Sequence, residues 1–403
     1  MSNFTTCAAW GVIATPSIGT RSLRWLPLVL ITLLPGCPDG HEPVCHNGED
    51  CNWVFVSGSG ELGGCAIRAD GSAWCWGDND SGELGDGTKT DRQRPVRVQG
   101  ISDVAGISCG HSHVCAWLED GTLWCWGSNG DGRLGDGTTE TRLVPVNIPM
   151  QAAVVSVHLH YVSSFALLAD GTVWRWGGGF TTVPEQFEEI DDVVALADKG
   201  GCAIKGDGTA WCWGGNGYGQ LGDGSGLSSN TPVQVLGLSG VVEVDQGYNY
   251  ACAVTGAREA WCWGSNYGGK LGDGTTEDAS APVRVALDDV VSISAGFFHT
   301  CAITGDGSVS CFGDGYLGVW ENGDFAETLL PVRVDNLQDV VQVHVINGSP
   351  SRTLAITADG TAWGWGDVSY GMLPLDVPDY WVIPDQSDPN RFWVWQPYPL
   401  VDP

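Results

Sequence analysis

A stretch of thirteen residues that carries two cysteines ten positions apart recurs along this chain. It reads CAIRADGSAWCWG from Cys65, CAWLEDGTLWCWG from Cys115, CAIKGDGTAWCWG from Cys202 and CAVTGAREAWCWG from Cys252. Recurrence at a near-constant period is typical of architectures in which similar units stack on their neighbours. The length of 403 residues alone would suggest two or three domains, but the repetition predicts one closed repeat domain.

Seven units are found when the repeats are aligned on the second aromatic residue of the motif. The spacings between these residues are 50, 50, 37, 50, 49 and 53, and the units cover about residues 53–401. The aligned positions are Trp76, Trp126, Trp176, Trp213, Trp263, Phe312 and Trp365. Short valine-rich runs bounded by Gly, Asp, Asn and Pro predict strands joined by turns, so we expect an all-β fold.

The charge of the chain restricts its partners. Acidic residues number 48 and basic residues 18, which gives a formal net charge of −30 at pH 7. A charge of this size favours solubility and repels anionic surfaces. Because the sequence has no basic stripe and no nucleic-acid-binding motif, we expect no nucleic-acid partner.

The N-terminal segment has the pattern of an export signal. It contains no Asp or Glu up to Gly36, and Arg21 and Arg24 precede an apolar run too short to span a bilayer. The run ends in LLPGC, which resembles a bacterial lipobox with Cys37 as the lipidated residue. We expect residues 1–36 to be a signal peptide and 37–52 a tether, with secretion without a lipid as the alternative. Both routes export the protein. It is expected either on the cell envelope, anchored by a lipid, or in the extracellular space.

The ten-residue spacing of the cysteines fits a β-hairpin. In the first unit, a strand from Cys65 to Arg68 leads into a turn in which Gly71 takes the left-handed conformation. The turn places Cys65 opposite Cys75, within reach of a disulfide bond. Both cysteines are present in five units and both are absent from units 3 and 7, as expected of bonded partners.

Five cross-strand disulfides are therefore predicted, and they imply an oxidising compartment. The pairs are Cys65–Cys75, Cys115–Cys125, Cys202–Cys212, Cys252–Cys262 and Cys301–Cys311. Cys45 and Cys51 are expected to close a small loop in the tether, which leaves Cys109 as an odd thiol. Zinc is a weaker explanation of the pairs, because this spacing brings together two ligands and not four.

The tryptophans occupy the other face of the same hairpin, because strand side chains alternate. Cys65 and Cys75 point one way, whereas Ala66, Trp74 and Trp76 point the other. Each unit then has a tryptophan face and a cysteine face, and such sheets can stack around a ring. We expect the tryptophan face of one blade to cover the cysteine face of the next, which places these tryptophans in the core.

The unit VAGISCGHSHVCAWLEDGTLWCWGSNGDGRLGDGTTETRLVPVNI resembles the regulator-of-chromosome-condensation repeat family. The shared marks are G-x-x-H before the first cysteine, then D-G, W-x-W-G, G-x-L-G and a closing P-V, and they extend over most of the chain. The resemblance implies a seven-bladed β-propeller with four antiparallel strands per blade. It also implies that the ring closes when the C-terminal FWVWQPYPLV joins the blade that begins at Trp53.

Several departures distinguish this chain from the family pattern. Unit 3 lacks G-x-L-G-D-G-T and is shorter than the others. Unit 5 has Ala257 and Arg258 in place of D-G, and unit 6 has Ser310 and Phe312 in place of the two tryptophans. The founding member of the family exchanges nucleotide on a nuclear GTPase and binds chromatin. Because this acidic, exported chain has no basic tail, we expect neither activity.

Carboxylate-rich loops could bind calcium. Four LGDG loops and the loop of unit 1 supply Asp86, Asp136, Asp223, Asp273, Asp78, Asp80 and Glu83. Calcium prefers such ligands, but no complete twelve-residue calcium loop is present, and Asp-Gly turns form local backbone hydrogen bonds without a metal. We favour the structural explanation and expect no cofactor, with a calcium-stabilised structural lipoprotein as an alternative.

The histidines do not form a recognisable catalytic set. His113 and His299 lie two positions before the first cysteine, where unit 5 has Tyr250, and this tolerance indicates packing and hydrogen bonding. His158 and His160 share a strand face as a weak metal pair that lacks a third ligand. No G-x-S-x-G, H-E-x-x-H or P-loop motif is present. We therefore expect no enzymatic activity, with a carbohydrate-binding or hydrolytic propeller as the alternative.

Aromatic residues in loops, where the repeat does not require them, are the candidate partner-binding residues. They are Phe180, Tyr218, Tyr248, Tyr267, Phe297, Phe298, Tyr316 and Trp320. Loops carry function on rigid scaffolds and aromatic residues anchor interfaces, although these side chains could equally cover blade edges. We predict a monomeric, non-enzymatic protein-binding scaffold. A secreted branch of the family inhibits β-lactamases, so an inhibitor is one form of this prediction.

Overall fold

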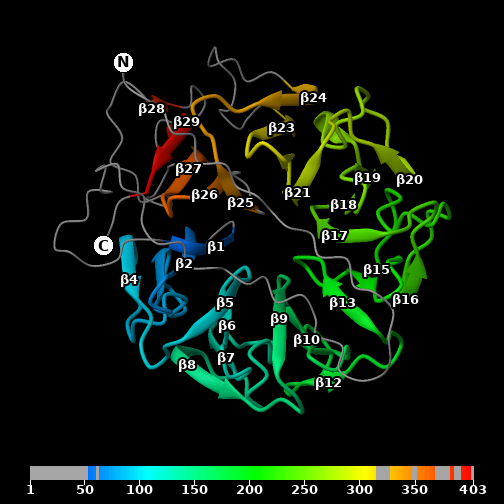
Figure 1. The fold of residues 1–403 in the computed structure, drawn as a ribbon. Helices are drawn as coiled ribbons and strands as arrows, with labels where there is room; N and C mark the ends of the chain where they lie inside the picture. Colours follow the sequence, from blue (N-terminus) through cyan, green and yellow to red (C-terminus); the bar gives the residue numbers. More distant parts are fainter. Residues whose placement is uncertain are drawn as a thin grey trace, which may run out of the picture. The chain divides into compact units, whose positions relative to one another are not determined.

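The computed structural model describes residues 53–59, 63–314, 327–346, 352–367, 382–384 and 392–400. These residues form seven antiparallel sheets arranged in a ring, which is the predicted seven-bladed β-propeller (Figure 1). Within this part of the chain, no helix is long and apolar enough to cross a membrane. The predicted signal peptide and tether, with Cys37, Cys45 and Cys51, lie outside the described residues, as do Tyr316 and Trp320.

The first six blades have four strands each, in chain order from the central channel to the rim (Figure 1). Blades 1 and 2 are β1 (Trp53–Ser59), β2 (Gly63–Arg68), β3 (Ala73–Gly77), β4 (Arg92–Arg97), β5 (Val104–Cys109), β6 (His113–Leu118), β7 (Leu123–Gly127) and β8 (Arg142–Ile148). Blades 3 and 4 are β9 (Val154–Leu159), β10 (Ser163–Leu168), β11 (Val173–Gly177), β12 (Glu185–Gln186), β13 (Val193–Leu196), β14 (Cys202–Lys205), β15 (Ala210–Gly214) and β16 (Ser229–Gln234). Blades 5 and 6 are β17 (Val241–Gln246), β18 (Tyr250–Thr255), β19 (Ala260–Gly264), β20 (Ala279–Arg284), β21 (Val290–Ala295), β22 (His299–Thr304), β23 (Val309–Gly313) and β24 (Thr328–Arg333), with a short 3-10 turn, η1 (Tyr267–Gly269), in blade 5.

Blade 7 has five strands and corrects the prediction of how the ring closes. Its strands are β25 (Val340–Ile346), β26 (Arg352–Thr357), β27 (Ala362–Asp367), β28 (Val382–Pro384) and β29 (Phe392–Pro399). The sheet order is β25-β26-β27-β29-β28, so the C-terminal strand pairs with β27 and not with the blade that begins at Trp53. The closure prediction is therefore wrong, because blade 7 takes its outer strands from its own end of the chain.

Side chains rather than a shared strand join blade 7 to blade 1. The Gln342 carboxamide forms two hydrogen bonds with Val56: its Nε2 donates to the carbonyl oxygen and its Oε1 accepts the amide N–H, each at 3.1 Å. Trp76 of blade 1 packs in one buried cluster with Leu354 and Ile356 of blade 7. The ring is therefore closed by the same kind of lateral contact that joins the other blades.

The cysteine-bearing hairpins fold as predicted. Cys65 lies opposite Cys75, and Gly71 has a positive φ of 76°. Asp70 Oδ1 accepts hydrogen bonds from the Ser72 N–H at 2.9 Å and from its hydroxyl at 2.6 Å. All five predicted cross-strand pairs are disulfides, and Cys109 is a buried free thiol. Five disulfides indicate an oxidising, extracellular environment.

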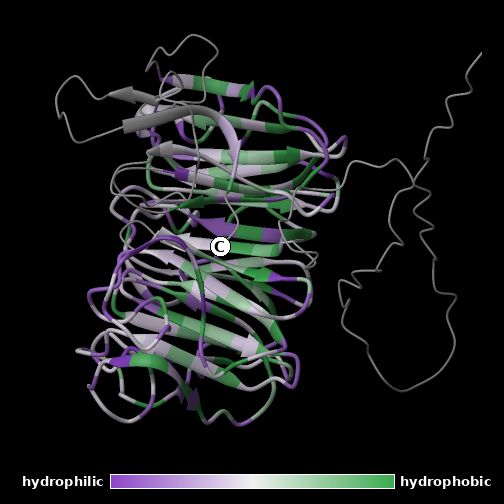
Figure 2. Ribbon diagram, turned by 90° about the vertical axis from the view of Figure 1, so that its left-hand side faces the viewer, coloured by the Kyte–Doolittle hydropathy of each residue, from purple (hydrophilic) through white to green (hydrophobic). Residues whose placement is uncertain are grey.

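The blades stack through the two predicted faces, but in the opposite direction. Trp126 of blade 2 packs on Cys65 and Cys75 of blade 1, so each tryptophan face covers the cysteine face of the preceding blade. The same direction holds for Trp176, Trp263, Phe312 and Trp365. Seen from the side, apolar residues run along the strands of successive blades (Figure 2). These aromatic residues are fully buried, which confirms that they belong to the core.

The G-x-L-G loop of one blade receives the indole of the next. Trp263 Nε1 donates a hydrogen bond to the Gln220 carbonyl oxygen at 3.0 Å, and the ring lies against Gly222. Gly222 has a φ of 68°, and a Cβ there would lie 2.8 Å from two atoms of the indole. Trp126 and Trp176 donate in the same way to Glu83 and Arg133. The motif is therefore a contact between blades.

Substitution of Gly222 tests this contact against a matched control. Gly226 in the same loop has a φ of 65°, but a Cβ added there would meet nothing within 4 Å, so Gly226→Ala isolates the cost of the backbone conformation. We expect Gly226→Ala to lower the free energy of unfolding by about 1 kcal/mol. Gly222→Ala adds the collision with the indole and should lower it by about 2–4 kcal/mol. Denaturant unfolding of both variants measures the difference, and equal losses would contradict the inter-blade role.

Candidate functional site at the channel mouth

Two sets of loops meet on one face of the ring. We call it the AB face, after the loops between the first strand (A) and the second strand (B) of each blade. They are the loops between the first and second strands of each blade, near the channel, and those between the third and fourth strands, near the rim. Backbone hydrogen bonds join the two sets, as between the Ser128 N–H and the Ser112 carbonyl oxygen at 2.8 Å. The described candidate aromatics, Phe180, Tyr218, Tyr248, Tyr267, Phe297 and Phe298, all lie in these loops. The hairpin turns between the second strand (B) and the third strand (C) of each blade form the opposite face, which we call the BC face.

Three of the candidate aromatics form one stack. The Tyr248 and Phe297 rings are parallel, with centroids 4.0 Å apart, and Phe298 lies 4.4 Å from Phe297. Lys270 fixes the loops that carry them, because its Nζ donates to the carbonyl oxygens of Tyr248 at 2.9 Å and Phe297 at 3.4 Å. Tyr248 is 44% exposed, so the stack presents an aromatic surface to solvent.

The structure does not bring Tyr218 and Tyr267 into this stack. Both lie in the outer loops of the AB face, 50% and 63% exposed, and neither has a ring contact with another described residue. Phe180 is separate as well. It lies in blade 3, where its ring contacts the Arg175 guanidinium at 4.4 Å. These three residues are therefore peripheral to the stack formed by Tyr248, Phe297 and Phe298.

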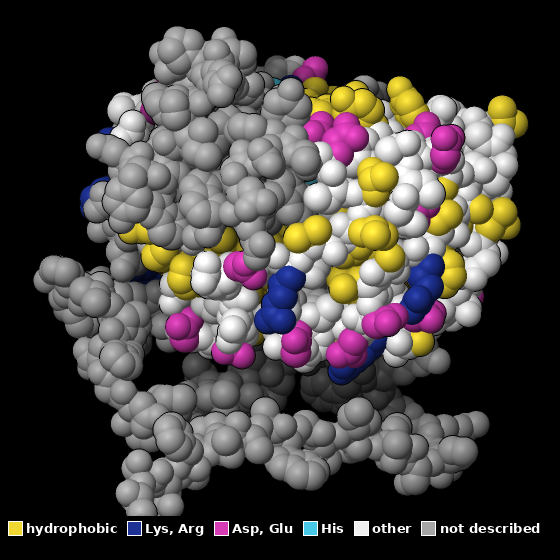
Figure 3. Space-filling view, turned by 90° about the horizontal axis from the view of Figure 1, so that it is seen from above, with side chains coloured by type: hydrophobic (Ala, Val, Ile, Leu, Met, Phe, Trp, Pro, Cys, Tyr) yellow, Lys and Arg dark blue, Asp and Glu magenta, His cyan; other side chains and the backbone are white. Residues whose placement is uncertain are grey.

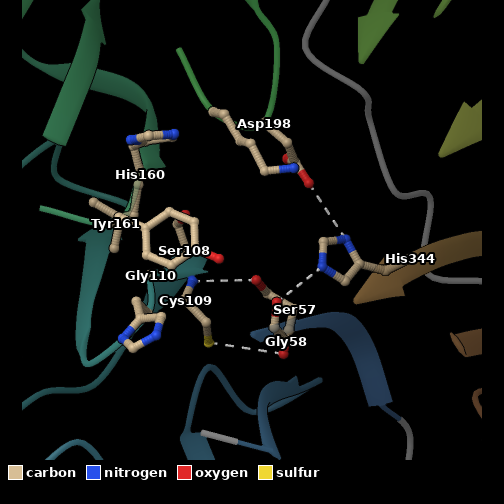
Figure 4. A pocket seen from close by; sticks show the side chains of 12 residues that line it. Ser57, Gly58, Ser108, Cys109, Gly110, His160, Tyr161, Asp198 and His344 are labelled. Carbon is tan, nitrogen blue, oxygen red and sulfur yellow. Dashed lines mark hydrogen bonds and ion pairs between the residues drawn. The ribbon is translucent and has the colours of Figure 1, made fainter. Parts of the chain in front are cut away.

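A pocket opens where the channel reaches the AB face. It has an empty volume of about 520 Å³, including solvent at its mouth, and is lined by residues of blades 1, 2, 3, 4 and 7 (Figure 4). Its side chains include Cys109, His111, Tyr161, Asp198 and His344. The Cys109 amide donates to Ser57 Oγ at 3.3 Å, and burial raises the pKa of the Cys109 thiol to about 12. The thiol is therefore protonated and a poor nucleophile.

Aromatic rings form one wall of the pocket. Tyr161 is 45% exposed, and its ring centroid lies 4.8 Å from that of His111 and 5.5 Å from that of His160. Arg133 holds the loop in place, because its Nη1 donates to the Tyr161 carbonyl oxygen at 3.1 Å and to Ser112 Oγ at 3.0 Å. The wall is therefore fixed to the neighbouring loop.

A contact between a carboxylate and an imidazole joins blade 4 to blade 7 across the channel. Asp198 Oδ2 lies 3.5 Å from His344 Nδ1, and His344 Nε2 lies 3.3 Å from the Gly58 carbonyl oxygen (Figure 4). The Asp198 side chain is 42% exposed, whereas that of His344 is 13% exposed. The carboxylate therefore remains accessible from the pocket, while the imidazole is held between two acceptors.

Two further carboxyl groups line the channel in blade 5 and bind blade 6. Glu243 Oε1 accepts hydrogen bonds from Ser292 Oγ at 3.0 Å and from the Ile293 N–H at 3.3 Å. Asp245 Oδ2 accepts the Ala295 N–H at 2.7 Å. Burial raises the pKa of Glu243 to about 7, and burial together with the Asp198 charge raises that of Asp245 to about 6.

A lysine shares the channel with these carboxyl groups. Lys199 Nζ donates to the Gln246 carbonyl oxygen at 2.9 Å. Burial lowers the pKa of Lys199 to about 8, against the opposing effect of Asp245 and Asp198. The carboxyl groups of this region therefore lie beside an ammonium that is itself costly to keep charged.

The LGDG carboxylates are used in local hydrogen bonds. Asp136 Oδ1 accepts from the Thr138 N–H at 3.0 Å, from its hydroxyl at 2.7 Å and from Asn129 Nδ2 at 3.0 Å. Hydrogen bonds of the same kind are present at Asp86, Asp223 and Asp273. This pattern supports the structural explanation of the LGDG loops.

Potential metal ligands gather at one place in the described part of the chain. Asp78, Asp80 and Asp91 offer carboxylate oxygens within 4.8 Å of one another. His158 and His160 belong to no such group among the described residues. His158 Nε2 lies 2.9 Å from Ser156 Oγ, and burial lowers its pKa to about 4.

The residues before the first cysteine connect neighbouring blades, as the sequence indicates. His113 Nε2 lies 3.1 Å from Ser164 Oγ of the next blade, and His299 Nε2 lies 2.8 Å from Thr353 Oγ1. Burial lowers the pKa of both histidines to about 3, so they are neutral. Their role is structural.

Most of the pocket residues carry no recognisable motif in the sequence. Tyr161, Asp198, Lys199 and His344 were not among the candidate residues, because no motif joins them. One signal was available, since His111, Tyr161, Lys199, Tyr248 and Phe297 all fall between an inner strand and the strand that bears the first cysteine position. The residues at this place differ from unit to unit, and they surround the mouth of the channel.

The family model for the regulator of chromosome condensation (RCC1) repeat matches residues 70–117, 120–167, 207–254 and 259–303. A second model of the same repeat matches residues 104–133 and 290–318, and the two together cover about half of the chain. The chain belongs to the RCC1 repeat family. Its family membership and its seven blades agree with the resemblance noted in the sequence.

Solved structures of low sequence identity share the fold of this RCC1-repeat chain. Prp20p of Saccharomyces cerevisiae is 21% identical with a TM-score of 0.69, and 88% of each chain is covered. The same yeast protein in complex with Kap60 is 23% identical, with a TM-score of 0.67 and coverage of 82% and 83%. Human WBSCR16 is 20% identical, with a TM-score of 0.66 and coverage of 75% of this chain and 86% of that chain.

Curated relatives match only a short segment. The human E3 ubiquitin-protein ligase HERC2 is 39% identical over 56 residues, which is 13% of this chain and 1% of the ligase. The mouse ligase gives the same match. The matched segment therefore spans about 1% of the length of these relatives.

The raised pKa of Glu243 predicts a pH-dependent stability. The folded protein holds this proton up to a pH of about 7, whereas the ordinary value is 4.5, so the stability associated with the protonated form is lost as pH rises between these values. Glu243→Gln keeps an oxygen acceptor without the charge. We expect its free energy of unfolding to match the wild type near pH 4.5 and to exceed it by on the order of 1–2 kcal/mol at pH 8.

Denaturant unfolding at the two pH values measures this effect. Glu188→Gln removes an exposed carboxylate at the rim and serves as the control, which should not change the pH dependence. A Glu243→Gln protein that is less stable than the wild type at pH 8 would show that the ionised carboxylate stabilises the contact between blades 5 and 6.

Proposed function

We propose that the protein is a non-enzymatic scaffold that binds another protein through the AB face. The observation that carries the proposal is the stack of Tyr248, Phe297 and Phe298, which is partly exposed and held by Lys270. Aromatic side chains that are already ordered lose little entropy on binding and are frequent anchors of protein interfaces. The neighbouring channel mouth adds polar groups that can supply specificity.

Related propellers and the charge of the chain support a protein partner. The solved structure of Prp20p is described with its binding to Gsp1p and histones, and a second structure has Kap60 bound to the same yeast protein. The present chain has a net charge of −30, and acidic side chains lie at several places on the side of the molecule drawn in Figure 3, some of them next to Lys or Arg. This charge favours a partner with a basic contact surface.

The groups of the pocket support binding more than catalysis. Ser57 Oγ accepts a backbone N–H, the Cys109 thiol is protonated, and His344 lies between a carboxylate and a carbonyl oxygen. A nucleophilic mechanism requires a nucleophile hydrogen-bonded to a base, and these groups are engaged with the backbone instead. We therefore propose that the chain has no enzymatic activity.

We further propose that the scaffold acts outside the cytoplasm. Five disulfides support an oxidising compartment. The sequence LLPGC supports a lipid at Cys37 that anchors the propeller to the cell envelope. A binder of this kind can act as an inhibitor if its partner is an enzyme of the same compartment.

Substitution of the aromatic stack tests the proposal. The purified, oxidised protein is immobilised, exposed to envelope and culture extracts with and without calcium, and the retained proteins are identified by mass spectrometry. We expect Tyr248→Ala and Phe297→Ala each to weaken retention of a specific protein by at least about tenfold, as at interface anchors. Leu236→Ala is the matched control, because Leu236 is 50% exposed in the connection between β16 and β17 and lies outside the stack.

Each outcome decides between the candidate functions. A protein retained by the wild type and by Leu236→Ala but lost from both stack variants supports binding through the AB face. A protein lost only from Leu236→Ala moves the interface to the connection between β16 and β17 on blade 4. Retention of glycans in place of protein favours a carbohydrate-binding propeller, and retention that depends on calcium but not on the stack favours a calcium-stabilised structural role.

A further inference from the structure

We propose that the pocket at the channel mouth receives an arginine side chain of the partner protein. This inference rests on the proposed function, since it names a group of the partner that enters the AB face. It is carried by an accessible carboxylate, an aromatic wall and an excess of carboxyl groups in the same pocket and channel. Glu243 and Asp245 also bind blade 6, but the exposed Asp198 carboxylate and the exposed Tyr161 ring have no such role in joining the blades.

Asp198 supplies the acceptor for the incoming cation. Its side chain is 42% exposed, and its partner His344 lies 3.5 Å away, which is longer than a strong charged hydrogen bond. His344 also has the Gly58 carbonyl oxygen at 3.3 Å, so it keeps a hydrogen-bond partner if Asp198 turns to a new cation. The Asp198 carboxylate can therefore bind a guanidinium while the His344 imidazole keeps a hydrogen-bond partner.

The charge of the channel favours a cation at this point. Asp198, Asp245 and Glu243 act on one another electrostatically, while Lys199 and, when it is protonated, His344 oppose Asp198. The Lys199 ammonium is turned to the Gln246 carbonyl oxygen at 2.9 Å and so is used within the protein. A second positive group at Asp198 would offset the repulsion between Asp198 and the buried Asp245 carboxyl group.

The aromatic wall favours arginine over lysine. Tyr161 is 45% exposed and lies 4.8 Å from the His111 ring and 5.5 Å from the His160 ring (Figure 4). A planar, weakly hydrated guanidinium can stack on such rings while it bonds a carboxylate, whereas an ammonium remains strongly hydrated. The buried Leu159 and Cys109 side chains also line the pocket and offer apolar surface to the aliphatic stem of the arginine.

Short peptides provide a probe that does not depend on knowing the partner. The purified, oxidised protein with isotope-labelled histidine is titrated with acetyl-Gly-Arg-Gly-amide, and the imidazole resonances are followed by nuclear magnetic resonance. We expect saturable shifts at His111, His160 and His344. The same peptide with citrulline, which is isosteric but uncharged, should bind at least about tenfold more weakly, because it lacks the charge-assisted hydrogen bond.

Two variants and a control identify the residues responsible. We expect Asp198→Asn to weaken binding of the arginine peptide by at least about tenfold and Tyr161→Leu by about threefold to tenfold. Asp335→Asn makes the same change of charge at an exposed position on the BC face and should bind as the wild type does. Thermal unfolding of each variant shows whether the propeller is intact, and Asp198 and Tyr161 are exposed enough for it to remain so.

The opposing results are distinct. Equal binding of the arginine and citrulline peptides, or an Asp198→Asn protein that binds like the wild type, overturns the arginine site. Agmatine that binds far more tightly than the peptide overturns the docking role, because the pocket would then serve a free guanidinium compound. If the peptide does not bind but Tyr248→Ala still loses a protein partner, this inference fails while the proposed function stands. If the peptide binds as expected but the stack variants retain every partner, the arginine site stands while the proposed binding through the stack fails.

Discussion

The packing of an aromatic ring from each blade on the preceding blade is the contact on which the rest of the molecule depends. A fully buried indole removes a large apolar area from water, but its N–H must find an acceptor. The G-x-L-G loop provides that acceptor, as Arg133 does for Trp176 at 2.8 Å. Blade 6 keeps the packing without the hydrogen bond. Phe312 has no N–H, and the Lys270 carbonyl oxygen accepts the Thr300 hydroxyl at 2.8 Å instead.

The same loop residue also links the core to the AB face. The backbone of Arg133 accepts the indole N–H of the next blade, while its side chain donates to the Tyr161 carbonyl oxygen at 3.1 Å. Lys270 repeats this arrangement, with its backbone in the core and its ammonium on the carbonyl oxygens of Tyr248 and Phe297. The aromatic groups that we propose as binding residues are therefore fixed by the packing of the blades. Loops ordered in this way can present a binding surface with little loss of entropy.

A structural feature could be predicted from the sequence when it depends on residues that are close together in the chain. The hairpin register and the five disulfides depend on ten residues and one turn, so the sequence predicts them residue by residue. The pocket depends on five blades that meet around one channel, and Asp198 reaches His344 only because the ring closes. The resemblance indicates that a ring forms but places the C-terminal strand in the wrong blade. Residues that meet across the channel could therefore not be paired from the sequence.

The direction in which the blades stack, by contrast, could have been predicted from the repeats. His113, Tyr250 and His299 each place a polar group inside the protein, where it must be paired. Their partners are Ser164, Thr300 and Thr353, each from the following unit and each one position before its cysteine position. Where the preceding unit lacks His or Tyr at this place, the equivalent residues are Gly64, Val114, Gly201 and Ala251. A hydroxyl thus occurs only where a buried ring in the previous blade needs it. Comparing neighbouring units, rather than aligning all seven, would have shown which face of each blade meets the next.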